Sequence, residues 1–140
     1  MTPPKPFIHH FPVRFTHTDP AGYVFFPRYF EMLQATVEEW FGQALGIKYS
    51  SFILDRKLGT PTAKTECEFL QPCLLGEILE IAVTLEKIGR SSLTLRFDGQ
   101  VAGEPRMQAR SVLVVIDLGD GRPRPIDDDL RRRMEAYQAG

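Results

Sequence analysis

The chain of 140 residues has few of the side chains that several kinds of site require. Its two cysteines, Cys67 and Cys73, are spaced as neither a zinc knuckle nor a redox CxxC pair, so we expect reduced thiols that serve packing. Of its three histidines, His9 and His10 are neighbours and would point to opposite faces of a strand, while His17 suits a solvated loop. The sequence therefore predicts no metal site.

Other absences bear on location and partners. No apolar run approaches the ~20 residues that cross a bilayer, and the N-terminus lacks the charged-then-apolar order of a signal peptide. The formal charge of −1, without a long block of lysine or arginine, gives no field that would attract nucleic acid. We therefore expect a soluble cytoplasmic protein with no membrane or nucleic-acid partner. A serine triad has no support either, because no Gly-x-Ser-x-Gly elbow is present.

Composition favours one domain over residues 1–140, because 43% apolar and 25% charged side chains suit one buried core and the length is short for two. Three prolines within residues 1–6 predict an extended lead-in. Residues 126–138 have acids near the start and bases further along, which suits the dipole of a C-terminal helix.

Hydrophobic patterning predicts a strand and a long helix in the first third of the chain. Residues 7–15 nearly alternate, although Pro12 removes one ladder donor and suggests an edge or a bulge. Residues 30–45 carry apolar side chains at helical spacing, bulky aromatics among them, which indicates a helix that packs on a sheet. A short helix or irregular turn is expected over residues 51–58.

After residue 59 the pattern becomes that of strands, and in residues 77–87 one parity is apolar along most of its length. Short links between the strands favour a meander of antiparallel hairpins. The expected fold is α+β, an antiparallel five-stranded sheet wrapped around one long helix. Its exposed edges predict a homo-oligomer, a dimer or a dimer of dimers. The later candidate strands are residues 62–70, 77–87, 92–101 and 106–118.

The junction between the first strand and the helix carries a carboxylate, Asp19, in an Asp-Pro-Ala-Gly turn. Pro27 suits the first helical position, where its missing N–H is not needed. Asp19 therefore lies near a helix N-terminus, where a carboxylate can cap the helix or form an Asx turn with Pro20. Spacing alone favours such a structural role over a catalytic one.

Residues 19–29, DPAGYVFFPRY, resemble the Asp-Pro-Ala-Gly-x-Val-x-x-Pro-x-Tyr signature of the 4-hydroxybenzoyl-CoA thioesterase family, a group of hotdog-fold acyl-CoA thioesterases. Residues 59–61, 90–91 and 120–124 agree with the family in order and spacing. The resemblance implies a hotdog fold and hydrolysis of an acyl-CoA or aryl-CoA thioester to free acid and CoA. No cofactor is implied, because coenzyme A is part of the substrate. For Asp19 the resemblance favours catalysis.

Thioester hydrolysis needs an attacking group and a donor for the oxyanion. Asp19 can attack the carbonyl carbon to form a mixed anhydride, or it can deprotonate a water molecule, and the sequence leaves both open. Backbone N–H groups at a helix start are ready donors. The resemblance assigns this role to the N–H of Phe26, and Pro27 has none to give.

The resemblance also implies substrate-binding residues. Loop arginines suit the phosphates of CoA, and residues of the central helix border the acyl pocket. The hydroxybenzoyl-specific member of the family has an aspartate where this chain has Gln34, so the acyl group stays open. The CoA candidates are Arg90, Ser91, Arg122, Arg124 and Thr60, and the acyl-pocket candidates are Tyr29, Leu33 and Gln34.

Two other functions are compatible with a hotdog fold. A non-catalytic module could bind an acyl-CoA or an acyl-carrier protein, although binding alone needs no carboxylate beside the thioester. A dehydratase would need a histidine with an acid partner near the helix, and the only nearby histidine, His17, lies before it.

Overall fold

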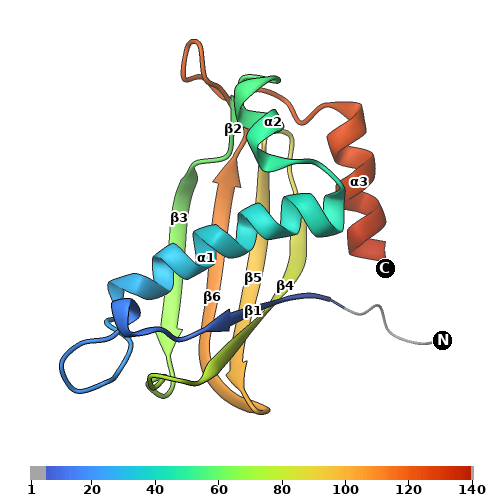
Figure 1. Ribbon diagram of the computed structural model, residues 1–140. Helices are drawn as coiled ribbons and strands as arrows, with labels where there is room; N and C mark the ends of the chain where they lie inside the picture. Colours follow the sequence, from blue (N-terminus) through green and yellow to red (C-terminus); the bar gives the residue numbers. More distant parts are fainter. Residues whose placement is uncertain (1–5, 140) are drawn as a thin grey trace.

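The computed structural model describes residues 6–139, so the lead-in expected over residues 1–6 lies outside the described residues apart from Pro6. Five strands form one antiparallel sheet, and a long helix crosses one of its faces (Figure 1). The expected α+β, hotdog-type architecture is confirmed. The strands are β1 (Phe7–Pro12), β3 (Thr62–Phe69), β4 (Ile78–Ile88), β5 (Ser92–Val101) and β6 (Glu104–Val114), in the spatial order β1-β4-β5-β6-β3.

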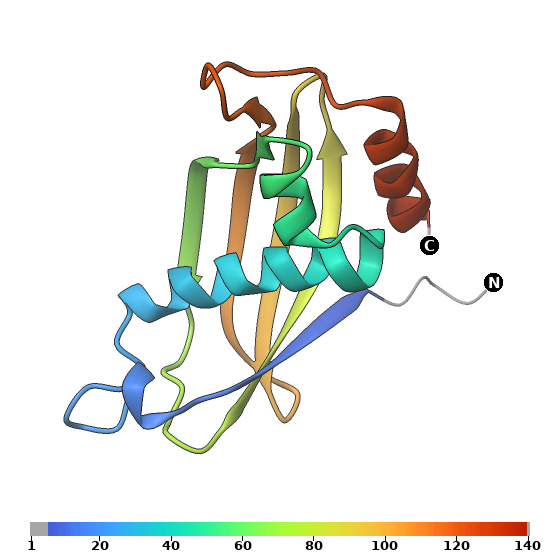
Figure 2. The same cartoon turned by 45° about the horizontal axis from the view of Figure 1, so that its top comes forward.

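The central helix, α1 (Pro27–Trp40), has Pro27 at its first position, as predicted. It continues through a π-helical turn, η2 (Phe41–Leu45). Figure 2 shows α1 crossing the strands of the sheet. The helix buries one apolar face there, because its apolar residues recur with the helical period. The buried residues of α1 are Tyr29, Met32, Leu33, Thr36, Val37 and Trp40.

The sheet face beneath α1 forms the core. In β4 the predicted apolar parity is buried, with Leu79, Ile81 and Val83 no more than 1% exposed. Val83 lies opposite Phe97 of β5, which is also fully buried. Burial of each such side chain stabilises the fold by about 1.5–3 kcal/mol, so this face fixes how the sheet and helix pack.

The first strand is shorter than predicted. Residues 7–15 were expected to be extended, but β1 ends at Pro12, and a 3-10 turn, η1 (Phe15–His17), follows. The turn forms because the imidazole Nδ1 of His17 accepts the N–H of Arg14 at 2.9 Å. β1 is an edge strand, as Pro12 suggested.

The expected meander is correct only for β4, β5 and β6. β3 pairs with β6 and not with β4, so residues 70–77 cross the end of the sheet, and we call this segment the crossover. Three strand spacings amount to about 14 Å, whereas eight extended residues reach about 26 Å. A short link is therefore compatible with two strands that are not neighbours.

Short elements close the opposite end of the sheet. α2 (Tyr49–Leu54) begins and ends earlier than the helix expected over residues 51–58, because the chain then pairs as β2 (Leu58–Gly59) with β7 (Ile116–Asp117). The single strand expected over residues 106–118 is accordingly two strands, β6 and β7.

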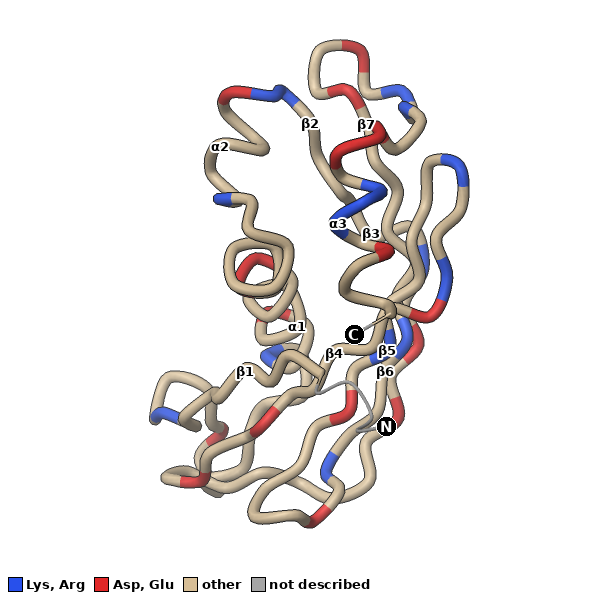
Figure 3. Tube along the Cα trace, turned by 90° about the vertical axis from the view of Figure 1, so that its right-hand side faces the viewer, with Lys and Arg blue, Asp and Glu red and all other residues tan. Residues whose placement is uncertain are grey.

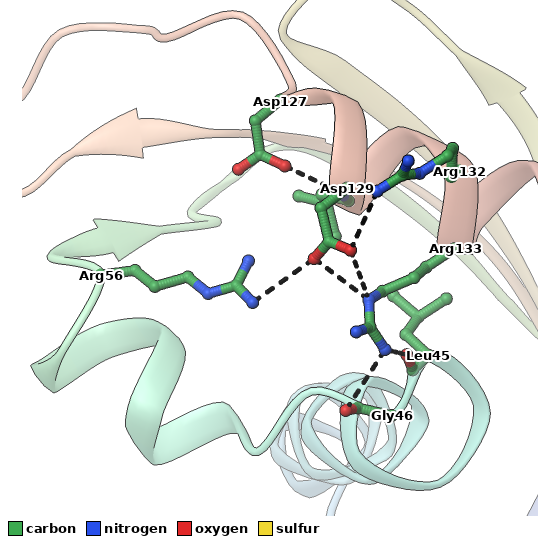
Figure 4. Close-up of polar contacts among 8 residues, drawn as sticks. Leu45, Gly46, Arg56, Asp127, Asp129, Arg132 and Arg133 are labelled. Carbon is green, nitrogen blue, oxygen red and sulfur yellow. Dashed lines mark hydrogen bonds and ion pairs between the residues drawn. The ribbon is translucent and has the colours of Figure 1, made fainter.

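The C-terminal helix, α3 (Asp128–Ala139), packs against the end of the central helix (Figure 4). Arg133 donates to the carbonyl of Leu45 at 2.8 Å and to the carboxylate of Asp129 at 3.1 Å. Asp129 also lies 3.5 Å from the guanidinium of Arg56, which follows α2. Because the last carbonyls of a helix lack partners within it, Arg133 satisfies one of them while it fixes α3.

Figure 3 shows lysines and arginines, interspersed with acids, on the end of the molecule that holds α2, β7 and α3. Within residues 6–139 no helix has the length and apolar character needed to cross a membrane. The cytoplasmic location stays a prediction.

Candidate active site

The Asp19 turn is a hydrogen-bonded loop between η1 and α1. The N–H of Asp19 donates to the carbonyl of Tyr23 at 2.8 Å. The Oδ1 atom of Asp19 accepts the N–H groups of Ala21 at 2.9 Å and of Tyr23 at 3.3 Å. This is the Asx turn that the sequence left open. The helix-cap alternative is wrong, because Phe26 is the N-cap of α1.

One oxygen of the Asp19 carboxylate is free of hydrogen bonds within residues 6–139. Its Oδ2 atom accepts no hydrogen bond from residues 6–139, and the side chain is half-exposed. The two bonds to Oδ1 fix the orientation of the group. Gly22 has φ +84°, a left-handed conformation that favours glycine, and this allows the tight turn. The turn therefore presents one oriented carboxylate oxygen.

The start of α1 leaves one backbone donor unused. Arg28 N–H donates to the carbonyl of Phe25 at 2.8 Å, and Tyr29 N–H donates to that of Phe26 at 3.1 Å. Pro27 has no N–H, and the N–H of Phe25 donates to the carbonyl of His17 at 2.9 Å. Within residues 6–139 the N–H of Phe26 has no acceptor, so this donor and the helix dipole are open to an anion.

A groove of about 160 Å³ lies between α1 and the sheet, near the β3 edge. Leu33 and Gln34 line it, as the resemblance implies for an acyl pocket. Tyr29 does not line this groove, because it is buried and its hydroxyl accepts the N–H of Cys73 at 3.2 Å. The remaining lining residues are Phe30, Val37, Thr62, Thr65, Phe97, Ser111 and Leu113.

The groove has apolar walls and one pair of hydroxyl groups. Thr65 Oγ1 and Ser111 Oγ are 2.8 Å apart, and Ser111 is only 5% exposed. Two hydroxyls carry two hydrogens, and their mutual bond uses one of them. Neither hydroxyl has another hydrogen-bond partner within residues 6–139, so the second hydrogen is left for a group in the groove.

The CoA candidates lie apart from the Asp19 turn. Their loops stand at the end of the sheet that holds β7 and the β4–β5 hairpin, whereas the Asp19 turn is at the opposite end (Figures 1 and 2). Arg90 and Arg122 are exposed and have no ion-pair partner within residues 6–139, while Arg124 lies 3.3 Å from the carboxylates of Asp117 and Asp120. One chain therefore does not bring these arginines to Asp19.

Two further candidates at that end are less accessible. Thr60 is 6% exposed, and its hydroxyl lies 3.3 Å from that of Tyr49. Ser91 is half-buried, and its carbonyl accepts the N–H of Val115 at 2.8 Å.

Residues 13–134 match the model of a family described as the thioesterase-like superfamily. The chain belongs to this superfamily. The resemblance drawn from the DPAG motif is thereby confirmed, and the match includes both the Asp19 turn and the loops that carry the arginines.

Individual relatives of this superfamily member are CoA thioester hydrolases by name. A 1,4-dihydroxy-2-naphthoyl-CoA hydrolase of Nostoc punctiforme is 26% identical over 88% of this chain and 82% of its own length. One from Prochlorococcus marinus is 32% identical over 66% of this chain and 63% of its own length.

Solved structures share the fold. A gentisyl-coenzyme A thioesterase superposes with a TM-score of 0.83 at 24% identity, over 91% of this chain and 99% of that one. A thioesterase from Thermus thermophilus, complexed with coenzyme A and zinc, gives 0.81 at 25% identity over 97% and 96%.

Sequence reasoning missed a partly buried ion pair in this superfamily member, between Arg106 and Glu77 at the end of the crossover. Arg106 of β6 is 8% exposed and donates to both carboxylate oxygens of Glu77, at 2.8 and 3.0 Å. These hydrogen bonds hold the pKa of Glu77 below its usual range and raise the pKa of Arg106. No signal marked the pair, because both residues stand at strand ends, where charged side chains are usually solvated.

The two thiols behave as the sequence predicted. Both cysteines are free, and Cys73 is fully buried. Burial raises the pKa of the Cys67 thiol to about 11 and also raises that of Cys73. Thiols with raised pKa values are poor nucleophiles at neutral pH, so neither cysteine is a candidate nucleophile.

Proposed function

We propose that this chain hydrolyses an aryl-CoA thioester to a free acid and CoA, with Asp19 as the attacking group or base and the Phe26 N–H as oxyanion donor. The supporting observation is the Asx turn, which leaves one carboxylate oxygen free in the loop that leads to the unused N–H of Phe26 at the helix start. As a nucleophile, Asp19 Oδ2 would bond to the carbonyl carbon as the C–S bond breaks, and water would then cleave the anhydride. As a base it would take a proton from the attacking water and pass it to the departing CoA sulfur.

The aryl class is supported by the groove and by the relatives. Phe97 and Leu113 offer apolar contact, and the Thr65–Ser111 pair offers a hydrogen bond within the groove. The 1,4-dihydroxy-2-naphthoyl and gentisyl groups named for the relatives are hydroxylated aromatic acyl groups, which need both features. The proposed reaction requires no cofactor, since CoA arrives with the substrate.

A second copy of the chain completes the proposed site. All residues of β3 except Cys67 are exposed, so this edge is open to another strand. Antiparallel pairing of two β3 edges about a twofold axis would set the Arg122 end of one copy beside the Asp19 end of the other. The exposed rings of Phe26 and Phe30 have centroids 6.3 and 6.4 Å from that of the exposed Phe69. Such a contact would cover all three rings.

The test is thiol release by the purified chain from benzoyl-, dihydroxynaphthoyl-, phenylacetyl- and aliphatic CoA thioesters. Asp19→Asn should abolish release and leave the oligomer intact. Asp127→Asn is the matched control, since the Asp127 side chain also accepts a backbone N–H, that of Leu130 at 2.7 Å, but lies immediately before α3. Full activity of Asp19→Asn would refute the assignment, and saturable CoA-thioester binding without turnover in the wild type would favour the non-catalytic module.

A further inference from the structure

The crossover supports both halves of the proposed catalytic centre. The carbonyl of Cys73 accepts the N–H of Val24 at 2.9 Å, and the N–H of Leu75 donates to the carbonyl of Gly22 at 3.0 Å. The N–H of Cys73 donates to the hydroxyl of Tyr29, in the first turn of α1, at 3.2 Å. One short segment thus contacts the Asp19 turn and the helix start together.

A second set of hydrogen bonds joins the crossover to Arg106 of β6 and to Glu77, the last residue of the crossover, and we call this pair the clamp. The guanidinium of Arg106 donates to the carbonyl of Pro72 at 2.9 Å as well as to both oxygens of Glu77. Glu77 in turn accepts the N–H of Leu74 at 2.6 Å. Because the planar guanidinium offers several donors in a fixed geometry, one side chain holds Pro72 and Glu77 at a set separation, which a lysine ammonium would not reproduce.

The clamp includes a buried polar group whose burial opposes folding, which a contact that served stability alone would not need. The Nε atom of Arg106 is buried and has no hydrogen-bond partner within residues 6–139, although a carboxylate oxygen of Glu104 lies 3.7 Å from it. An unsatisfied buried donor opposes folding, and a partly buried ion pair adds little net stability. The arrangement gains geometry rather than stability.

We infer that Arg106 and Glu77 are positioning residues for hydrolysis, which act through the crossover to set the Asp19 carboxylate against the Phe26 N–H. This inference rests on the proposed role of Asp19. A displacement of about 1 Å in a reacting group can lower turnover by about 100-fold, so loss of the clamp should appear in kcat. KM should change little, because the clamp touches neither the groove nor the loops of Arg90 and Arg122.

The test compares Arg106→Lys and Glu77→Gln with Arg110→Lys and Glu86→Gln. Arg110 and Glu86 form the matched pair, since Arg110 is also on β6, Glu86 is on β4, and their bidentate contact lies on the outer sheet face at 2.5 and 3.2 Å. Kinetics are measured well below each melting temperature on the same CoA thioester. Amide hydrogen exchange of Val24 and Leu75 gives a second readout that is independent of activity.

We expect the clamp variants to lose about 10- to 100-fold in kcat with KM nearly unchanged, and to exchange the amides of Val24 and Leu75 faster. The outer-face variants should keep wild-type kcat. Unchanged kcat in both clamp variants, or an equal loss in the outer-face variants, overturns the inference. If Arg106→Lys does not fold, Glu77→Gln decides. If Asp19→Asn is fully active, the proposed function fails instead, and the exchange rates still show whether the clamp orders the turn.

Discussion

The substitution Gly22→Ala separates the shape of the Asp19 turn from the stability of the fold. Gly22 has φ +84°, and an added Cβ would meet no atom within 4 Å, so the cost of alanine lies in the backbone alone. For an L-residue in the left-handed region this cost is about 1–2 kcal/mol. In a chain of this length we expect the melting temperature to fall by about 3–8 °C.

Gly103, in the turn between β5 and β6, is the matched control. Its φ is +82°, and an added Cβ there also meets no atom within 4 Å, so Gly103→Ala should cost the same stability. No hydrogen bond within residues 6–139 joins Gly103 to the Asp19 turn. Gly22, by contrast, donates to the carbonyl of Asp19 at 3.0 Å and accepts from Leu75. We therefore expect only Gly22→Ala to lower kcat, by about 10-fold or more.

Circular dichroism at one fixed protein concentration gives the melting temperatures, and thiol release well below them gives kcat. Two results would refute the reasoning. Wild-type kcat in Gly22→Ala would mean that the turn conformation does not position Asp19. An equal loss of kcat in Gly103→Ala would mean that loss of stability, and not local shape, reduces turnover.

Three further predictions use the same assays. Burial lowers the pKa of His9 although the charge of Glu39 raises it, and burial together with the charges of Arg28 and Arg14 lowers the pKa of His17. The unfolded chain therefore takes up protons first, so stability should be full above about pH 6.5 and fall below it, and His17→Gln should reduce the difference in denaturant midpoint between pH 7.5 and 5.5. Ala102 has φ 49° in the β5–β6 turn, and Ala102→Asn should raise stability by about 1 kcal/mol in denaturant unfolding, because asparagine tolerates this conformation. Ser111→Ala should raise KM for a hydroxyaryl-CoA by about 3- to 10-fold relative to benzoyl-CoA, and equal changes for both would remove the hydroxyl pair from recognition.

The fold could be predicted largely because its elements are encoded locally. Apolar alternation over residues 77–87 falls on β4, Ile78–Ile88, and the helical period after residue 30 falls on α1 and η2. The strand that pairs with β3 could not be predicted. The length of the link after β3 limits how far away the next strand can lie, but it does not determine which strands are neighbours. The first strand was predicted to be longer than it is, because the hydrogen bond between His17 and Arg14 depends on side-chain geometry that alternation does not encode.

The candidate site divides in the same way. Asp19, Gly22 and Phe26 lie within eight residues of one another, so a motif can carry their arrangement. The clamp joins Glu77, at the end of the crossover, to Arg106, 29 positions later, and the predicted meander contained no such crossover. Tyr29 was expected beside the acyl group because of its position on the central helix. It lies instead on the face of α1 that packs against the crossover.

The two ends of the sheet therefore have different functions in the proposed enzyme. The end with the Asp19 turn, the crossover and the start of α1 is held together by backbone hydrogen bonds and a partly buried ion pair, which suits chemistry that depends on distances between atoms. The end with Arg90 and Arg122 presents exposed guanidinium groups on loops, which suits a flexible, charged carrier whose phosphates need attraction more than exact placement. Within one chain the two ends are separated by the full length of the strands. In the proposed enzyme they can act on one substrate only if two copies pair through the exposed β3 edge.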